Sequence, residues 1–256
     1  MHTTRILRAF WLLGAFCLAA TLAGAQTAEV LIAKGDSFDR RLQTAEALQN
    51  YLLAEKLDRE NAQLLVRIAR QYRHSMTDAP SKKEKLRLGR VALDYAQRAA
   101  ALAPNDADAQ LAPATSLGKL LPYMGTKEQA DSSPRIKKAV DRTLQLDPTN
   151  DTAWHVLGRW NRVLADMSAV KRALAGAIYG KLPVTTNEAA EKCLLKAIAL
   201  NSNRLIHDIE LGRIYAQMGR KEDARKAIEK GLAMPNQEKD DAEMKAIGRE
   251  LLKKLG

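Results

Sequence analysis

Residues 205–234, LIHDIELGRIYAQMGRKEDARKAIEKGLAM, contain the pattern that decides the fold. Apolar residues recur every three or four positions on both sides of Gly219, which indicates two helices joined by a short turn. The first helix carries Leu211, Gly212 and Tyr215, and the second carries Ala224, Ile228 and Gly231. Because small residues let two backbones approach closely, this stretch predicts a tightly packed helix pair.

Four earlier segments repeat parts of this pattern and close with related phrases. The phrases are Leu57–Asn61, Leu102–Asp106, Leu146–Asn150 and Leu200–Asn203, and Leu232–Pro235 closes the last copy. In each phrase an apolar residue completes a packed helix face, and Pro or a short polar side chain ends that helix and caps the next one. Repeated helix pairs of about 34 residues are typical of tetratricopeptide repeats. Gly158 and Gly212 fall where the two helices of such a pair lie closest.

The predicted fold class is an all-α, right-handed α-solenoid of about five tetratricopeptide-like helix pairs with a C-terminal capping helix. The repeats are expected near 28–61, 62–106, 107–150, 151–204 and 205–236, and the cap in 237–256. The capping helix is expected over Gln237–Leu255, with Met244, Ile247, Leu251 and Leu255 on one packed stripe. The middle repeats are longer than about 34 residues, so longer or extra helices are expected in Ser75–Lys85, Tyr123–Pro134 and Arg162–Asn187. A HEAT-like array is the alternative architecture, and the glycine positions argue against it.

The composition excludes other classes of protein. The chain has 256 residues, of which 46% are hydrophobic, and this excludes disorder over most of its length. No segment alternates apolar and polar residues as half-buried strands do, which excludes a sheet protein. The two cysteines, Cys17 and Cys193, cannot form a disulfide framework, and no Cys/His spacing predicts a zinc site. We expect Cys193 to be a buried apolar residue and not a reactive thiol.

The first 25 residues have the features of a secretory signal peptide. Arg5 and Arg8 precede the uncharged stretch Ala9–Ala25, which ends in small residues at the positions that a signal peptidase reads. We therefore expect cleavage near Ala25 and an exported, periplasmic protein. An N-terminal membrane anchor is the alternative, although a spanning helix needs about 20 apolar residues.

From about Val91 to its end, the chain resembles the regulator-of-microtubule-dynamics family of tetratricopeptide proteins. The resemblance rests on Leu157–Trp160, Ala165–Met167, Lys171–Ala175, Leu182-Pro183 and Thr185–Ala189, which form a long insertion within one repeat. It implies a binding role without catalysis. Animal members are associated with microtubules or organelle membranes, and one branch is linked to phospholipid binding. An exported, bacterial-type chain meets no tubulin, so we expect no tubulin partner.

The insertion also predicts structure from its own residues. Thr185 and Glu188 match a capping box, so the second helix of this repeat is expected to begin near Thr186. Upstream, one face of an expected amphipathic helix carries Val170, Ala173, Leu174, Ala177 and Ile178. We expect this helix to pack on the solenoid. A flap over the groove, or a foot on a membrane surface, is the alternative.

The candidate binding residues lie on the first helices of the pairs, which line the concave groove of such solenoids. They are Arg67, Arg70, His74, Lys119, His155, Arg159, Arg162 and Arg213. Because guanidinium groups match carboxylates and phosphates geometrically, this set predicts an anion-binding groove. The alternative is that these cations are solvated or paired with neighbouring carboxylates.

The chain contains no recognisable catalytic, metal-binding or nucleotide-binding motif, so we expect neither enzyme activity nor a cofactor. The predicted function is a scaffold that binds a protein or peptide partner with an acidic group or a C-terminal carboxylate. A phospholipid-binding or lipid-transfer protein that uses the same groove is the alternative. Nucleic acid is not expected despite the net charge of +11, because the chain lacks aromatic residues spaced for base stacking.

Overall fold

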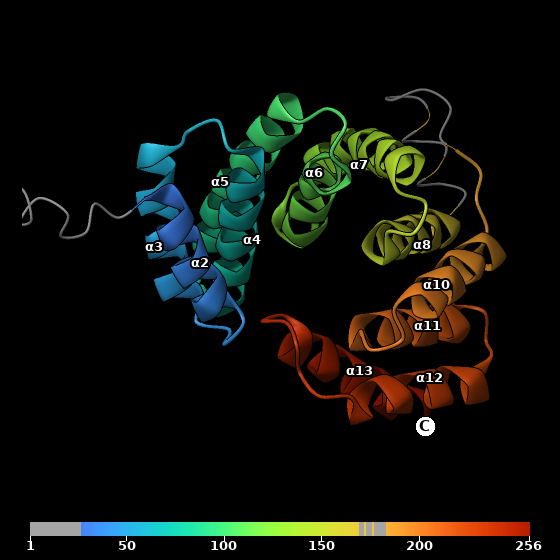
Figure 1. Cartoon of the computed structure of the whole chain (residues 1–256). Helices are drawn as coiled ribbons and strands as arrows, with labels where there is room; N and C mark the ends of the chain where they lie inside the picture. The colour runs from blue at the N-terminus through green and yellow to red at the C-terminus, as the bar shows by residue number, and fades with distance from the viewer. Residues whose placement is uncertain (1–26, 169–171, 173–175, 177–182) are drawn as a thin grey trace, which may run out of the picture.

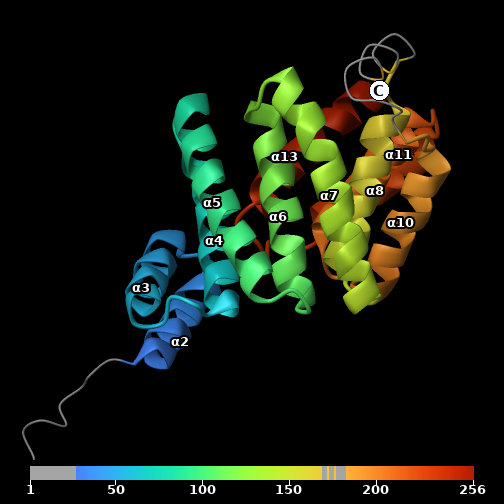
Figure 2. The same ribbon diagram turned by 90° about the horizontal axis from the view of Figure 1, so that it is seen from above.

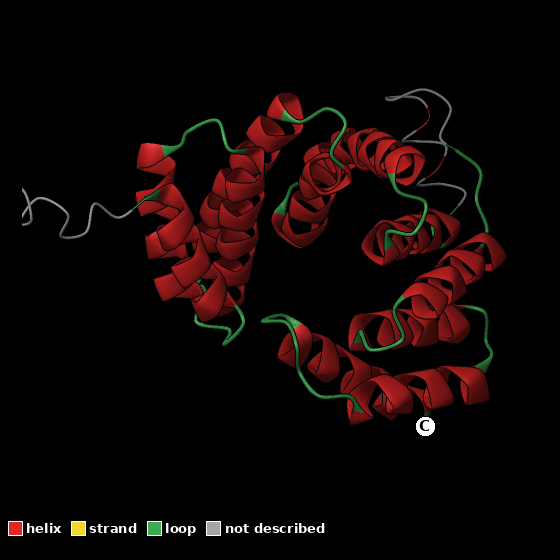
Figure 3. Ribbon diagram, in the orientation of Figure 1, coloured by secondary structure: helices red, strands yellow, loops and turns green. Residues whose placement is uncertain are grey.

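The computed structural model describes residues 27–168, 172, 176 and 183–256. Within these ranges every regular element is a helix (Figure 3), which confirms the predicted all-α class. The predicted signal peptide and the five apolar residues of the predicted insertion helix lie outside the described residues. In the same ranges, none of the helices combines the length and the apolar character that crossing a bilayer requires.

Within the described residues, five helix pairs follow one another and a last helix packs on the fifth pair. The pairs are α2 (Ala28–Asp39) with α3 (Thr44–Leu57), α4 (Ala62–Asp78) with α5 (Lys82–Leu102), α6 (Ala107–Leu120) with α7 (Thr126–Leu146), α8 (Asp151–Ala165) with α10 (Asn187–Leu200), and α11 (Leu205–Gln217) with α12 (Lys221–Ala233). The last helix is α13 (Asp241–Leu255), and a short 3-10 turn, η2 (Leu121–Tyr123), follows α6. The predicted α-solenoid of five pairs with a C-terminal helix is therefore confirmed.

The repeated phrases cap the first helices of three pairs. The side-chain oxygens of Asn61, Asp106 and Asn150 each accept a hydrogen bond from the backbone N–H three residues later, at 2.8–3.0 Å. Each bond satisfies one of the N–H groups that a helix start leaves without an internal partner. The short polar residues after Leu57, Leu102 and Leu146 therefore begin the next helix, as the sequence indicates. The predicted cap after Leu200 is wrong, because α11 begins after Arg204, whose side chain makes no capping hydrogen bond.

The cap of α10 differs from the prediction by one residue. Thr186 caps this helix, because its hydroxyl accepts the backbone N–H of Ala189 at 3.2 Å. The Thr185 hydroxyl instead lies 2.5 Å from the side-chain oxygen of Asn161 on α8. The predicted cap at Thr185 is therefore wrong, since a contact with the neighbouring helix already engages that hydroxyl.

Longer helices absorb the additional residues of the second and third repeats. Helix α4 has 17 residues, and α5 and α7 have 21 residues each, compared with 12 in α2. Both α5 and α7 extend into the predicted segments Ser75–Lys85 and Tyr123–Pro134. The expectation of elongated helices is confirmed for these two segments.

Two glycines permit the closest approach between paired helices. A Cβ atom built on Gly158 would lie 1.8 Å from Cδ2 of Leu194, and one on Gly212 would lie 2.4 Å from Cγ1 of Ile228. Leu194 and Ile228 are fully buried, so neither can turn aside easily. The predicted role of both glycines is confirmed.

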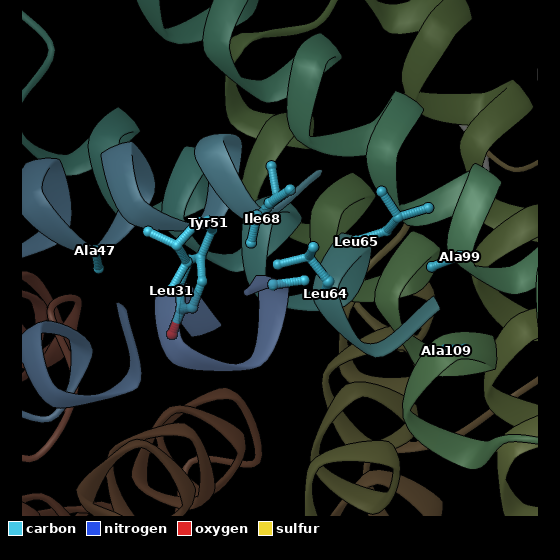
Figure 4. Close-up of a cluster of buried hydrophobic side chains, with 10 residues drawn as sticks. Leu31, Ala47, Tyr51, Leu64, Leu65, Ile68, Ala99 and Ala109 are labelled. Atoms are coloured by element: carbon cyan, nitrogen blue, oxygen red, sulfur yellow. The ribbon is translucent and has the colours of Figure 1, made fainter. Parts of the chain in front are cut away.

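The core is a row of clusters that lie between consecutive helices. In the N-terminal cluster, Leu31 of α2 and Tyr51 of α3 pack with Leu64, Leu65 and Ile68 of α4 (Figure 4). Alanines fill the narrower positions of this cluster, and Ala47, Ala54 and Ala99 are fully buried. Neighbouring pairs are thus held together by small and large apolar side chains that alternate across each interface.

The array curls so that its C-terminal part returns toward α4 (Figure 1). Helices α4, α6, α8 and α11 lie around the interior, and α5, α7, α10 and α12 lie outside them. Helix α13 passes behind α6 in Figure 2, and its first turn is joined to α6 by ion pairs. Curling therefore places the first helices of four pairs around one interior.

The capping helix begins four residues later than predicted. Residues 237–240 are not helical, because the Asp241 carboxylate accepts the backbone N–H groups of Gln237 and Glu238 at 2.7 and 2.8 Å and holds them in a turn. Leu255 is buried and Leu251 packs with it against α12, but Ile247 is 37% exposed. The predicted stripe is therefore correct at its C-terminal end and wrong at Ile247.

Candidate functional site

We call the interior-facing side of α4, α6, α8 and α11 the inner surface. We call residues 237–243, which join α12 to the first turn of α13, the acidic strap. The strap reads QEKDDAE and lies against the inner surface at α4 and α6. The strap therefore contacts two of the predicted groove residues, Arg70 and Lys119.

On α4, two of the predicted arginines are paired with carboxylates. The Arg67 guanidinium contacts the Asp36 carboxylate of α2 at 2.8 Å. The Arg70 guanidinium lies 2.9 Å from the Glu238 carboxylate of the strap and 3.5 Å from Asp39 of α2. Burial alone would lower the pKa of Arg70, but the charges of Glu238 and Asp39 raise it above its usual value. Arg70 is thus held between the N-terminal pair and the strap.

Lys119 of α6 is the second anchor of the strap. Its ammonium lies 2.6 Å from the Glu243 carboxylate and 3.1 Å from that of Asp240. The hydroxyl of Thr77 on α4 also contacts Asp240, at 2.6 Å. Burial would raise the pKa of Asp240, but the positive charge of Lys119 and the hydrogen bonds from Thr77 and Lys119 together lower that pKa. The Asp240 carboxylate is therefore held in its charged form between α4 and α6.

A second group of charges surrounds Glu210 of α11. The Glu210 carboxylate is 1% exposed and contacts Arg162 of α8 at 2.7 Å and Arg213 of its own helix at 2.9 Å. Burial would raise the Glu210 pKa, but the charges of Arg162, Arg213 and Arg159 lower it to about 2. Arg162 and Arg213 are thus brought together on a buried carboxylate that joins the fourth and fifth pairs.

The two predicted histidines are neutral and buried. Burial lowers the pKa of His74 to about 3 and that of His155 to about 3, so neither adds positive charge to the groove at neutral pH. The Nδ1 atom of His155 lies 3.1 Å from Nδ1 of His207, whose Nε2 lies 2.9 Å from the Asp151 carboxylate. His155 therefore belongs to a hydrogen-bonded chain between α8 and α11.

Two arginines of the inner surface have no carboxylate partner among the described residues. Arg73 of α4 donates to the hydroxyl of Thr115 on α6 at 2.7 Å. Burial and the charge of Arg70 lower the Arg73 pKa to about 10. Burial also lowers the pKa of Arg159 on α8, and within the described residues this side chain makes no hydrogen bond. Both arginines are half-buried and have no counter-charge in contact among the described residues, which is the setting that favours binding of an anion.

Sequence reasoning places Arg159 in the groove but omits Arg73 and the strap. Arg73 lies three residues after Arg70, so continuing the same helix face would have found it. The strap carboxylates are absent from the prediction because residues 237–240 were expected to be helical. No periodic signal relates Glu238 to Arg70, which lie 168 residues apart in sequence.

The structure also bears on metal and thiol chemistry. Among the described residues, no group of three or more His, Cys, Asp or Glu side chains could hold a metal ion. Cys193 is 8% exposed, and its sulfur accepts a hydrogen bond from the Asn161 side-chain amide at 3.7 Å. Burial raises the pKa of the thiol, which agrees with the predicted role of Cys193 as a buried apolar residue.

Comparison with known proteins identifies relatives of the chain. The model of the family described as regulator of microtubule dynamics protein 1-3 matches residues 27–256. Regulator of microtubule dynamics protein 1 of Mus musculus is 26% identical over 236 residues, which cover 91% of this chain and 77% of that protein. The Caenorhabditis elegans protein 1 is 25% identical over 191 residues, or 75% of this chain and 84% of that protein. The match to protein 2 of Rattus norvegicus, at 23% identity and 83% of this chain, covers about half of that protein, 52%.

Two solved structures support the fold assignment. A thermophilic tetratricopeptide protein of Thermus thermophilus superposes with a TM-score of 0.61 at 17% identity, covering 88% of this chain and 99% of its own. PilF of Pseudomonas aeruginosa superposes with a TM-score of 0.51 at 15% identity, covering 89% of this chain and 91% of its own. At these identities the likeness concerns the fold alone.

Proposed function

The chain belongs to the regulator of microtubule dynamics 1-3 family, and from that premise we propose that it is a non-catalytic scaffold whose inner surface binds an acidic segment of a protein partner. Family membership and the helix-pair solenoid support a scaffold role, because such solenoids present extended concave surfaces for binding. The names of the relatives refer to microtubules, but the chemistry proposed here requires only carboxylates on the partner.

The observation that carries this proposal is that the inner surface already holds an acidic peptide segment, the strap. Glu238, Asp240 and Glu243 pair with Arg70 and Lys119 at 2.6–3.1 Å. The contacts are charge-assisted, and they come from the turn that holds Glu238 and Asp240 and from Glu243 in the first turn of α13. The strap is thus an example, within this chain, of peptide carboxylates bound to the inner surface.

Arg73 and Arg159 supply the remaining binding capacity. With no carboxylate in contact among the described residues, each would gain a charge-assisted hydrogen bond from an incoming anion. A phosphate would satisfy the same groups, so a phospholipid carrier remains the alternative function. Two hollows in the described residues, one along α5 and one between α5, α6 and α7, are lined by neither arginine. Both hollows are lined by other cations, among them Arg87 and Lys138, so their position does not separate a peptide from a phospholipid. The strap contacts are the support for a peptide.

We propose further that the chain is exported and that its partner lies in the same compartment. The support is the sequence alone: Arg5 and Arg8 precede an uncharged stretch that ends in small residues at Ala25. Intact-mass measurement of the protein isolated from its own host tests this directly. A mass that includes residues 1–25 would refute cleavage and would favour the N-terminal anchor.

Removing the two unpaired arginines tests the binding proposal. The probe is a fluorescently labelled peptide that extends the sequence of residues 236–244 by four glutamates, so that it offers carboxylates to Arg73 and Arg159 as well as to Arg70 and Lys119. It is titrated against the full chain and followed by fluorescence anisotropy. Arg73→Gln with Arg159→Gln should weaken binding by about tenfold or more, the loss of at least about 1.4 kcal/mol. The control, Arg87→Gln with Arg90→Gln, removes the same charge from α5, where both side chains are more than half exposed.

The outcomes separate the alternatives. Equal binding by both double variants would refute a specific role for the inner surface and would indicate attraction by net charge alone. Vesicles of phosphatidylglycerol in phosphatidylcholine serve as the second probe. Retention of the chain on these vesicles without any peptide binding, abolished by Arg73→Gln with Arg159→Gln, would favour the phospholipid alternative.

A further inference from the structure

The connection after α12 turns inward and does not continue the array. Pro235 and Asn236 follow the last turn of α12, and Asp241 then holds the backbone of Gln237 and Glu238 in a turn. The Lys245 ammonium of α13 donates to the backbone carbonyl of Met234, at the other end of this connection. Local hydrogen bonds therefore shape the strap before it makes any contact with α4 or α6.

The strap is held on the inner surface by charged and polar contacts. Glu238 pairs with Arg70, Asp240 with Lys119 and Thr77, and Lys239 with Asp78. Its only apolar side chain, Ala242, is exposed. In contrast, the later part of α13 is anchored through Gly248, Leu251 and Leu255, which pack on α11 and α12.

These contacts are of the kind that a competing anion can replace. The side chains of Arg70 and Glu243 are 37% and 39% exposed, and those of their partners Glu238 and Lys119 are 23% and 16% exposed. Ion pairs that reach solvent in this way are weakened by water and by salt. No apolar surface of the strap would have to be rehydrated on release. The strap can therefore leave α4 and α6 while α13 stays packed on the fifth pair.

A ligand that displaces the strap would gain contacts that the strap does not make. The strap carboxylates reach Arg70 and Lys119, but within the described residues none contacts Arg73 or Arg159. Both of these arginines lie on the inner surface, on α4 and α8. A longer acidic segment can satisfy all four cations, so its binding would exceed that of the strap.

We propose that the acidic strap is an intramolecular latch that occupies the peptide-binding groove. It is displaced by a longer acidic protein segment that carries three carboxylates spaced as in Glu238, Asp240 and Glu243 and further carboxylates for Arg73 and Arg159. This inference rests on the proposed function, because it assumes that the inner surface binds acidic peptides. It adds the chemistry of the partner and a way in which binding is regulated. In the free protein the strap occupies the groove, so the partner has to compete with a segment of the same chain.

The test is to neutralise the latch. The variant Glu238→Gln, Asp240→Asn, Glu243→Gln keeps Asp241 and the packed part of α13. It should bind the labelled peptide about tenfold tighter than the natural chain, because the groove is no longer occupied. The control, Glu222→Gln, Glu229→Gln, Glu250→Gln, removes the same charge from exposed positions of α12 and α13 and should bind as the natural chain does.

Hydrogen exchange gives a readout that does not depend on the peptide. Backbone amides of residues 237–243 should exchange faster in the latch variant than in the control, while those of α11 and residues 248–255 should not change. Faster exchange together with tighter peptide binding is the expected result. Unchanged exchange would show that the charges do not hold the strap and would overturn the latch.

Two further outcomes distinguish the failure of the latch from that of the proposed function. Equal peptide affinity of the latch variant and the natural chain would overturn the latch and leave the binding groove in place. Absence of peptide binding by either chain would overturn both. Light scattering measures the oligomeric state of both chains. A dimeric natural chain together with a monomeric latch variant would show that the strap occupies the groove of a second copy, and would overturn the proposal of an intramolecular latch.

Discussion

Replacing Glu210 with glutamine should destabilise the joint between the fourth and fifth helix pairs. The Glu210 carboxylate contacts Arg162 of α8 at 2.7 Å and Arg213 of α11 at 2.9 Å, and it is 1% exposed. Glutamine keeps the size of the side chain but removes the negative charge. The Arg162 side chain, itself 10% exposed, is then left in the interior without a carboxylate.

Two independent considerations give the same magnitude. Breaking a buried ion pair by removing one partner typically costs about 3–5 kcal/mol. The Glu210 pKa of about 2, compared with its usual 4.5, corresponds to about 3 kcal/mol of stabilisation of the charged form. A loss of about 3 kcal/mol should lower the Tm by about 6–12 °C in a chain of this size.

Urea unfolding followed by circular dichroism measures this effect. The control, Glu84→Gln, breaks the exposed pair with Arg87 and should leave the free energy of unfolding nearly unchanged. Adding Arg162→Met to Glu210→Gln removes the stranded cation and should recover part of the lost stability. A Glu210→Gln chain as stable as the Glu84→Gln control would refute the view that this carboxylate joins the two pairs.

Three further predictions concern a buried glycine, a buried histidine and the buried cysteine. Gly158→Ala should lower the free energy of unfolding by about 1–3 kcal/mol because of its contact with a buried leucine, whereas Gly118→Ala, with open space around it, should raise that energy by up to about 1 kcal/mol in the same urea assay. Lowering the pH from 7 to 5 should lower the free energy of unfolding by about 2 kcal/mol through His155, because this histidine takes up a proton near pH 6.5 in the unfolded chain but has a pKa of about 3 in the folded chain. A pH dependence of stability that is the same in the His155→Gln chain would contradict this assignment. In a Cys17→Ser chain, Cys193 should resist alkylation when folded and react fully in denaturant, and rapid labelling of the folded chain would show that the thiol is accessible.

The helix pairs were predictable because their determinants are local. An apolar face recurs at helical spacing, a capping residue follows three of the apolar endings, and Gly158 and Gly212 mark close contacts between paired helices. The error at Thr185 is of another kind. Two adjacent threonines can both cap a helix, and the choice of Thr186 depends on Asn161, which lies on a different helix. Sequence pattern therefore predicts that a cap exists, but tertiary contact selects the residue.

The chemistry of the inner surface was only partly predictable for the same reason. The spacing of Arg67 and Arg70 places both on one helix face, but it does not indicate that Asp36 and Glu238 reach them. Nor does it indicate that burial keeps His74 uncharged. Ion pairs between distant segments and the desolvation of a side chain both depend on how the helices pack, and neither produces a periodic pattern in the sequence.

The strap connects the two ends of the solenoid. In an open array each helix pair contacts only its neighbours, so the two ends behave almost independently. Here the pair between Arg70 and Glu238 joins residues 168 apart in sequence, and Lys119 joins the third pair to α13. These contacts link the two ends of the array chiefly through charge, so under the latch proposal a ligand that displaces the strap also uncouples those ends. The free energy of ligand binding is then coupled to the free energy of opening the array. By reciprocity, any condition that opens the array, such as high salt, must also release the strap from the groove.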